Sequence, residues 1–120
     1  MAAAKLQRSA RLGGSGVELR VWRLSDGGAP IFVPQPMHGL FYSGDAYVVR
    51  LTYTDSRGKG RAAIYEWHGK KSSQSSQMAA SQHVLECDGA LGGIATIIRC
   101  GQDAEPAHFL GLFEGKMVVR

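Results

Sequence analysis

The residues best placed to do chemistry in this 120-residue chain lie in the segment Phe41–Val49, which reads FYSGDAYVV. The pair Gly44-Asp45 stands just before a run rich in Val and Tyr that predicts a strand. At such a strand entry a backbone carbonyl and a carboxylate can face one point, and Ca²⁺ takes oxygen ligands of both kinds. The pair supplies only half of a calcium site. A turn that caps the strand is the competing interpretation.

Patterns that would support catalysis are missing. The histidines at positions 38, 68, 83 and 108 contain no pair with the spacing of a zinc-binding helix. The sequence has no G-x-S-x-G nucleophile elbow. The stretch Tyr42–Asp45 lacks the lysine and the spacing of a phosphate-binding loop. We therefore expect that the protein is not an enzyme.

The net charge of +4 comes mostly from one end of the chain. Lys5, Arg8 and Arg11 lie in the first sixteen residues, which contain no acid, and the remainder has eleven basic against ten acidic residues. A nucleic-acid-binding domain would carry a basic stripe on its folded body. We expect no nucleic-acid partner.

Two short basic clusters remain, Arg57, Lys59 and Arg61 in one and Lys70 with Lys71 in the other. They could contact an acidic protein or a phosphoinositide headgroup. A solvated, lysine-rich loop is the favoured interpretation of both clusters.

The composition fits one folded domain. Hydrophobic residues make up 44% of the chain, which is enough for a core, and no apolar run approaches the ~20 residues that span a bilayer. Cys87 and Cys100 are the only cysteines, so we expect free thiols in a reducing cytosol rather than a disulfide framework. Residues 1–16 are small, basic and Gly/Ser-rich, which predicts a flexible tail or an added leader before a domain over residues 17–120.

The elements that would position Gly44-Asp45 are mostly strands. Alternating or β-branched runs predict strands over residues 17–24, 31–33, 46–53, 62–68 and 95–100, with a last strand over 116–120. Ser72 and Ser73 offer N-caps for a helix of about fifteen residues. Pro106 suits the first turn of a second, short helix. The fold class is α+β, a five- to six-stranded mixed sheet between one long and one short helix.

Two stripes are expected on the long helix. Helical spacing assigns the core stripe to Ala80, Val84, Cys87 and Leu91, and an adjacent stripe to Met78, Gln82 and Leu85.

Five blocks of the sequence occur in the order of a gelsolin/villin repeat. They are Val21–Arg23, Phe41–Val49, Ile64–Lys70, Ser72–Gln74 and Glu105–Leu110, which resemble the family patterns V-W-R, F-[YF]-x-G-D-x-Y, I-Y-x-W-x-G, [SA]-[ST]-Q and E-P-x-H-F-L. The resemblance covers residues 17–120 and is strongest to the second and fifth repeats of the family. It implies a gelsolin-like fold and an actin-binding module of the cytoskeleton that caps, severs or bundles filaments as part of a longer protein.

The resemblance also implies a calcium site made by Gly44, Asp45 and an acid early in the long helix. The family motif S-Q-D-E becomes Ser73-Gln74-Ser75-Ser76, so Ser76 replaces the bidentate glutamate. A hard cation needs six to eight oxygens. We expect weak or absent calcium binding, with Asp88 as one further candidate ligand.

The actin-contacting helix of the family maps to the stripe of Met78, Gln82 and Leu85. Gln82 and His83 stand where repeats that insert into the actin cleft carry larger apolar residues. We therefore expect filament side-binding, or capping with weakened calcium dependence. The alternative is a degenerate scaffold domain that contacts other proteins, including neighbouring gelsolin-like repeats, without binding actin.

Overall fold

The computed structural model describes residues 16–120, so the predicted tail lies, but for Gly16, outside the described residues. The elements are β1 (Glu18–Leu24), β2 (Ile31–Val33), the 3₁₀ helix η1 (Gln35–Met37), β3 (Leu40–Phe41), β4 (Ala46–Thr54), β5 (Gly60–His68), α1 (Gln74–Ala90), β6 (Thr96–Gly101), α2 (Ala107–Gly111) and β7 (Val118–Val119).

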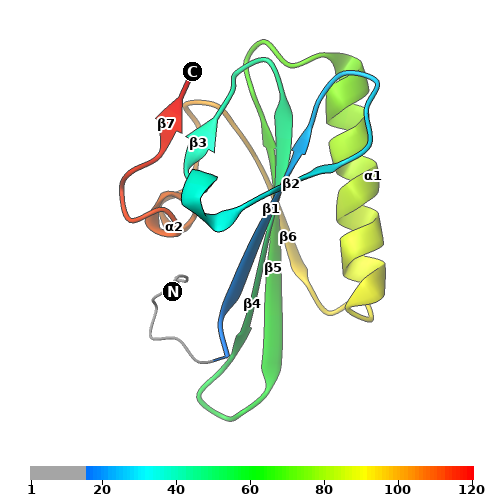
Figure 1. Ribbon diagram of the computed structural model, residues 1–120. Coiled ribbons are helices and arrows are strands. Elements are labelled where there is room, and N and C mark those ends of the chain that lie inside the picture. The colour runs from blue at the N-terminus through cyan, green and yellow to red at the C-terminus, as the bar shows by residue number, and fades with distance from the viewer. Residues whose placement is uncertain (1–15) are drawn as a thin grey trace.

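Five strands form one mixed sheet in the order β2-β1-β4-β5-β6 (Figure 1). Neighbours are antiparallel except β5 and β6, which are parallel and are joined through α1. The β4–β5 hairpin is matched over nine residue pairs, from Ala46 opposite His68 to Thr54 opposite Gly60. The strands predicted over residues 31–33, 46–53 and 62–68, the last two as a hairpin, are all confirmed.

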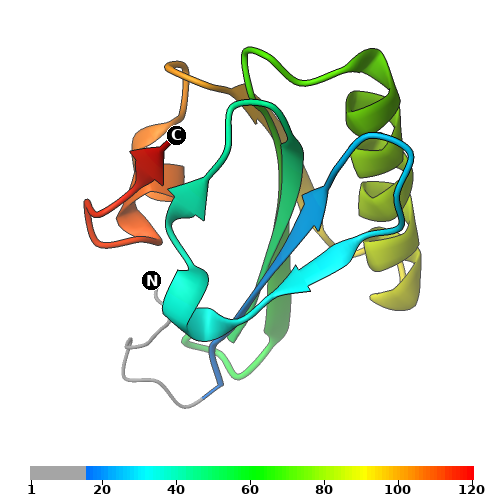
Figure 2. The ribbon, with the colours of Figure 1, turned by 45° about the horizontal axis from the view of Figure 1, so that its top comes forward.

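Each face of the sheet carries one helix, with α1 on one side and α2 on the other (Figure 2). Alternate side chains of the strands feed two separate cores. The α1-side core consists of Leu24, Ala46, Val48, Ile64, Ala80, Val84 and Cys87. The α2-side core is rich in aromatic rings and consists of Val21, Phe41, Tyr47, Val49, Leu51, Tyr65, Trp67, Phe109, Leu112 and Phe113. This arrangement confirms the predicted fold class.

The two cysteines lie on opposite faces of the sheet. Cys87 is part of the α1-side core, whereas Cys100 packs against the α2-side core, and both are free thiols. Burial raises the pKa of Cys100 to about 12 and also raises that of Cys87, so neither thiol is an activated nucleophile.

The long helix begins and ends where the sequence predicts. The Ser73 hydroxyl accepts a hydrogen bond from the amide of Ser76 at 3.0 Å and caps α1. Gly92 and Gly93 both have φ near +76°, and the amide of Gly93 donates to the Asp88 carbonyl, which closes the helix. The buried stripe of Ala80, Val84 and Cys87 confirms the core face.

The C-terminal strand differs from the prediction. Only Val118 and Val119 are extended, and they pair in parallel with Leu40 and Phe41 in a separate two-stranded sheet. The main sheet therefore has five strands and not six. Pro106 caps α2 from outside the first turn, because its ψ of 154° is extended.

Within the described range, no helix is both long and apolar enough to cross a membrane.

Candidate functional site

The Gly44-Asp45 turn is fixed by backbone contacts on two sides. The amide of Asp45 donates to the carbonyl of Tyr42 at 3.1 Å, and the carbonyl of Asp45 accepts from the amide of Gly69 at 3.1 Å. One residue earlier, the carbonyl of Ser43 accepts from the amide of Lys71 at 2.9 Å. The turn is thus held against the segment that leads into α1, which places Asp45 near the helix N-terminus.

The carboxylate of Asp45 already has a cationic partner. Arg23 on β1 donates its Nε–H to Oδ2 of Asp45 at 2.6 Å, and its guanidinium lies 4.6 Å from the ring centre of Tyr42. Burial is the largest single influence on Arg23 and opposes its charge, but the hydrogen bond to Asp45 and the charge interactions with Tyr47, Asp45 and Tyr42 together raise the pKa of the guanidinium. Arg23 therefore neutralises Asp45 at any physiological pH.

At the start of α1, hydroxyl groups stand in place of carboxylates. The hydroxyls of Ser73 and Ser76 are 3.1 Å apart, and Ser73 also donates to Oδ1 of Asp26 at 3.1 Å. Ser76 is fully buried and Ser75 is exposed. The first turn of α1 contains no acidic residue.

These residues do not fit a calcium ion. Calcium binds six to eight oxygens, usually with a bidentate carboxylate among them. In the part of the chain that the structure describes, no group of three or more His, Cys, Asp or Glu side chains could hold a metal. Gly44 and Asp45 form a turn at the entry to β4, with Arg23 supplying the positive charge beside the carboxylate.

Asp88 cannot complete a site at the start of α1, contrary to the sequence-based expectation. It lies twelve residues after Ser76 on the same helix, which corresponds to about 18 Å along the axis. Its Oδ1 accepts from the amide of Ala95 at 3.0 Å, so it closes the far end of the helix.

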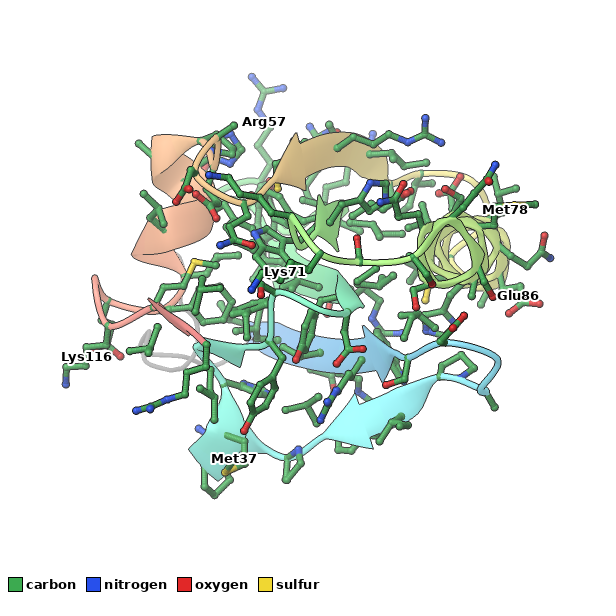
Figure 3. All side chains as sticks on the ribbon, turned by 90° about the horizontal axis from the view of Figure 1, so that it is seen from above. Met37, Arg57, Lys71, Met78, Glu86 and Lys116 are labelled. Atoms are coloured by element: carbon green, nitrogen blue, oxygen red, sulfur yellow. The ribbon has the colours of Figure 1, made fainter. Side chains whose placement is uncertain are left out.

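The stripe of Met78, Gln82 and Leu85 faces away from the sheet rather than sitting beside the core stripe. Met78 is 64% and Leu85 62% exposed, and Gln82 between them is exposed as well. The view along α1 in Figure 3 shows Met78 pointing outward from the molecule. Two large apolar side chains two turns apart on a solvent-facing helix are typical of a contact surface for another protein.

On the flank of α1 that faces β1, the ring of Trp22 meets the ring of His83 at 4.6 Å between centres. Phe32 on β2 continues this row at 6.3 Å from Trp22. Burial lowers the pKa of His83, so its imidazole is neutral at pH 7. Nδ1 of His83 lies 3.7 Å from Oε1 of Glu86, and the guanidinium of Arg50 lies 5.6 Å from the ring centre of Trp22 on the same flank.

The opposite flank of α1 is tied to β5 through a buried carboxylate that the sequence did not reveal. Glu66 accepts from the hydroxyl of Ser81 at 2.7 Å and from Nε2–H of His68 at 2.6 Å. Arg99 on β6 lies 3.4 Å away on the other carboxylate oxygen. A charged residue within an apolar strand is the one signal that could have identified this position.

The two basic clusters lie at opposite ends of the sheet. Arg57, Lys59 and Arg61 occupy the β4–β5 hairpin, where Arg61 pairs with Asp55 at 2.9 Å. Lys70 pairs with Asp103 near the start of α1. β4 has nine residues, and the eight steps between its ends correspond to about 26 Å, so the structure does not bring the clusters into one patch.

The α2 face carries structural contacts that sequence reasoning missed. Trp67 donates its indole N–H to Glu105 at 2.8 Å, and the hydroxyl of Tyr65 lies 2.7 Å from Nδ1 of His108. Both links join β5 to the segment around α2. The E-P-x-H-F-L block therefore reflects packing of α2 on the sheet rather than a reactive site.

These features define a class of α+β domain. Its prominent surface is the exposed face of the long helix, and a Gly-Asp turn is bonded to the segment at the start of that helix. Within that class, the chain belongs to the gelsolin repeat family, whose family match covers residues 33–110.

Curated relatives agree with this assignment. The chain is 39% identical over 87 residues to a cytoplasmic gelsolin of Homarus americanus, 33% over 102 residues to advillin of Mus musculus and 39% over 100 residues to villin-5 of Arabidopsis thaliana. These matches cover 72%, 85% and 83% of this chain. They cover only 11%, 12% and 10% of the relatives, so the chain spans about a tenth of their length.

Solved structures give the same fold. A chain of the Thorarchaeota 2DGel3/rabbit actin complex matches with a TM-score of 0.66 and 26% identity, over 85% of this chain and 45% of the other. A chain of the Thorarchaeota ProGel/rabbit actin complex matches with a TM-score of 0.56 and 15% identity, over 79% and 98%. The second likeness shows the fold alone.

Proposed function

We propose that this domain is an actin-binding module that contacts filaments through the exposed face of α1. The observation that carries the proposal is the pair of exposed apolar side chains, Met78 and Leu85, on a helix whose other face is buried in the α1-side core. The match to a gelsolin-type chain in a complex with rabbit actin supports the same partner. Association with the cytoplasmic actin cytoskeleton follows from this proposal.

Filament side-binding suits this helix better than insertion into the actin cleft. Gln82 lies between the two apolar anchors, and its amide reaches Glu86 at 3.4 Å. An amide that enters an apolar cleft loses its water without gaining a partner, which costs free energy. At the side of a filament the same amide stays hydrated at the rim of the contact.

Introduction of negative charge on α1 tests the proposal. We expect Met78→Asp with Leu85→Asp to weaken filament binding at least about a hundredfold, because two apolar contacts are replaced by carboxylates that must be desolvated. Co-sedimentation of the 120-residue chain with actin filaments measures the dissociation constant. Met37→Asp is the matched control, since Met37 is 45% exposed but lies on η1 rather than on α1.

Two outcomes would contradict the proposal. Unchanged pelleting of the Met78→Asp/Leu85→Asp variant would exclude α1 as the contact. No pelleting of the wild-type chain at tens of micromolar would favour the second candidate function, a scaffold domain that binds other proteins. The departures at Gln82, Ser75 and Ser76 from the family pattern favour that candidate.

We further propose that the module works without calcium as its switch. Arg23 occupies the Asp45 carboxylate, and the helix start offers Ser76 where the family has its bidentate acid. We expect a calcium dissociation constant weaker than about 10⁻⁴ M in titration calorimetry, at the weak end of protein sites.

Restoring the acid is the matched comparison for calcium. Ser76→Glu should tighten calcium binding at least about tenfold, whereas Ser76→Gln, which has the same bulk at this buried position, should not. A wild-type dissociation constant of a few micromolar would show that other oxygens replace the missing glutamate. Filament pelleting with and without calcium should then also differ.

The basic clusters add a weaker proposal, contact with phosphoinositide headgroups. Within the two clusters, Arg57 and Lys59 on the hairpin and Lys71 before α1 are exposed, and the described residues show no ion pair for them. Because the two clusters lie about 26 Å apart, one headgroup could contact only one of them.

A further inference from the structure

The helix α1 does not cover the whole sheet. It packs mainly on β1, β4 and β5, and the edge strand β6 lies beyond it. The register places Ile97 beside Ile64 and Arg99 beside Glu66. Ile64 belongs to the α1-side core, and Glu66 is bonded to α1, so Ile97 and Arg99 are on the same face of the sheet. That face is open at β6.

Exposed apolar groups collect at this opening. Ile94, in the loop before β6, is 59% exposed and Ile97 is 42% exposed. Ser81 lies on the side of α1 toward β6, because its hydroxyl donates to Glu66 on β5. Leu85 lies one helical turn beyond Ser81. Leu85 therefore leans toward the open strand. We call Leu85, Ile94, Ile97 and Arg99 the α1–β6 patch.

The exposed charge within the patch is positive. The Arg99 side chain is 71% exposed and its bond to Glu66 is long, at 3.4 Å, so its charge is available to a partner. The nearby acids are already engaged, because Glu66 is buried and Asp88 accepts from the amide of Ala95. An apolar surface with an exposed guanidinium at its edge fits a partner with an apolar contact area and an acidic rim.

The other flank of α1 presents an exposed carboxylate, Glu86, while the cation there, Arg50, is paired with Glu18. Phe32 is 55% exposed there. Glu86, which lies beside His83, stands between the ring of Phe32 and the exposed side chains of Met78 and Leu85. In the view along α1, Met78 and Glu86 point to different sides of the helix (Figure 3). A partner centred on Met78 and Leu85 would have to bury the Glu86 carboxylate before it reached Phe32.

From this asymmetry we infer that actin, bound through α1, also contacts the α1–β6 patch and leaves Phe32 free. The inference rests on the proposed function. It extends that function by assigning the orientation of the domain on the filament: β6 faces actin, and β2 faces away. Ile94 and Ile97 are the contacts that fix the orientation.

A pair of matched variants tests the orientation. Ile94→Ala with Ile97→Thr removes apolar surface but keeps a β-branched side chain in β6, and Phe32→Ala removes an equally exposed side chain on the other flank. In co-sedimentation of the whole chain with filaments, we expect the first variant to weaken the dissociation constant about tenfold and the second to leave it unchanged. Melting temperatures measured in parallel show whether each variant is folded.

A measurement on the wild-type chain covers the case in which the β6 variant does not fold. Hydrogen–deuterium exchange with and without filaments should slow in residues 94–99 and stay unchanged in residues 31–33. Two results would overturn the orientation and leave the proposed function intact. One is protection of residues 31–33 instead of residues 94–99. The other is wild-type affinity of the Ile94→Ala/Ile97→Thr variant while the Met78→Asp/Leu85→Asp variant loses binding. Absence of wild-type binding would overturn both.

Discussion

Replacement of Gly69 by alanine should destabilise the domain by about 3 kcal/mol or more, the upper range for overpacking a rigid site. A Cβ on Gly69 would overlap the carbonyl group of Ser43 and would lie 2.8 Å from the carbonyl oxygen of Asp45. Both obstacles are backbone, so no side chain can rotate away. The change would also separate the Gly69 amide from the Asp45 carbonyl, which it now contacts at 3.1 Å.

Gly89 provides the control for this experiment. Nothing lies within 4 Å of a Cβ added there, and the residue is near the end of α1. Gly89→Ala should be neutral or should stabilise the protein by up to about 1 kcal/mol through helix propensity. Urea unfolding followed by circular dichroism measures both variants. A loss below about 1 kcal/mol for Gly69→Ala would mean that the Asp45 turn and the start of α1 are not held together as described.

The close approach at Gly69 explains how the site is positioned. Without a side chain at residue 69, the turn at Ser43–Asp45 can lie directly against the end of β5. The carbonyl of Ser43 then accepts from Lys71 at 2.9 Å, two residues before the Ser73 cap. The geometry that brings Asp45 to the helix N-terminus therefore depends on backbone contacts and not on a bound cation.

Most of the sheet was predictable because its signals are local. Neighbouring residues set each of three signals: the alternation at Val17, Leu19 and Val21, the Asp55–Gly60 turn and the Ser73 cap. The structure confirms the strand, the hairpin and the helix start that these signals predict. A last strand over residues 116–120 was predicted, but β3 and the pairing of β3 with β7 were not. Each of these strands has only two residues, and their pairing joins segments about eighty residues apart, which a local pattern does not reveal.

The candidate site was predictable only in part, for a related reason. The sequence identified Gly44-Asp45 and the serines at the helix start, but the cation beside Asp45 comes from Arg23, twenty-two residues earlier. Its pairing depends on how β1 and β4 align, with Arg23 opposite Tyr47. Likewise, helical spacing grouped Met78, Gln82 and Leu85, but only the packing of α1 shows that this group faces solvent.

Phe41→Ala should cost about 4 kcal/mol, within the range for deleting a buried aromatic ring. Phe41 is fully buried in the α2-side core. Its ring centre lies 4.6 Å from that of Tyr47, 5.0 Å from Trp67, 5.4 Å from Phe113 and 6.0 Å from Phe109. Truncation removes the ring that joins strands β4 and β5 to α2, and a cavity among four aromatic side chains collapses poorly.

The loss should also reach the Asp45 turn, because Phe41 anchors the strand that leads into it. The carbonyl of Phe41 accepts from the amide of Arg120 at 2.8 Å, and the amide of Ser43 donates to the carbonyl of Arg120 at 2.8 Å. Phe32→Ala is the matched control and should cost less than about 1 kcal/mol, since that ring is more than half exposed. Urea unfolding gives both values, and hydrogen exchange of residues 40–45 reports the turn. Equal losses for the two variants would contradict the central place of Phe41 in the core, whereas faster exchange at 40–45 in Phe41→Ala alone would show that this core holds the turn against α1.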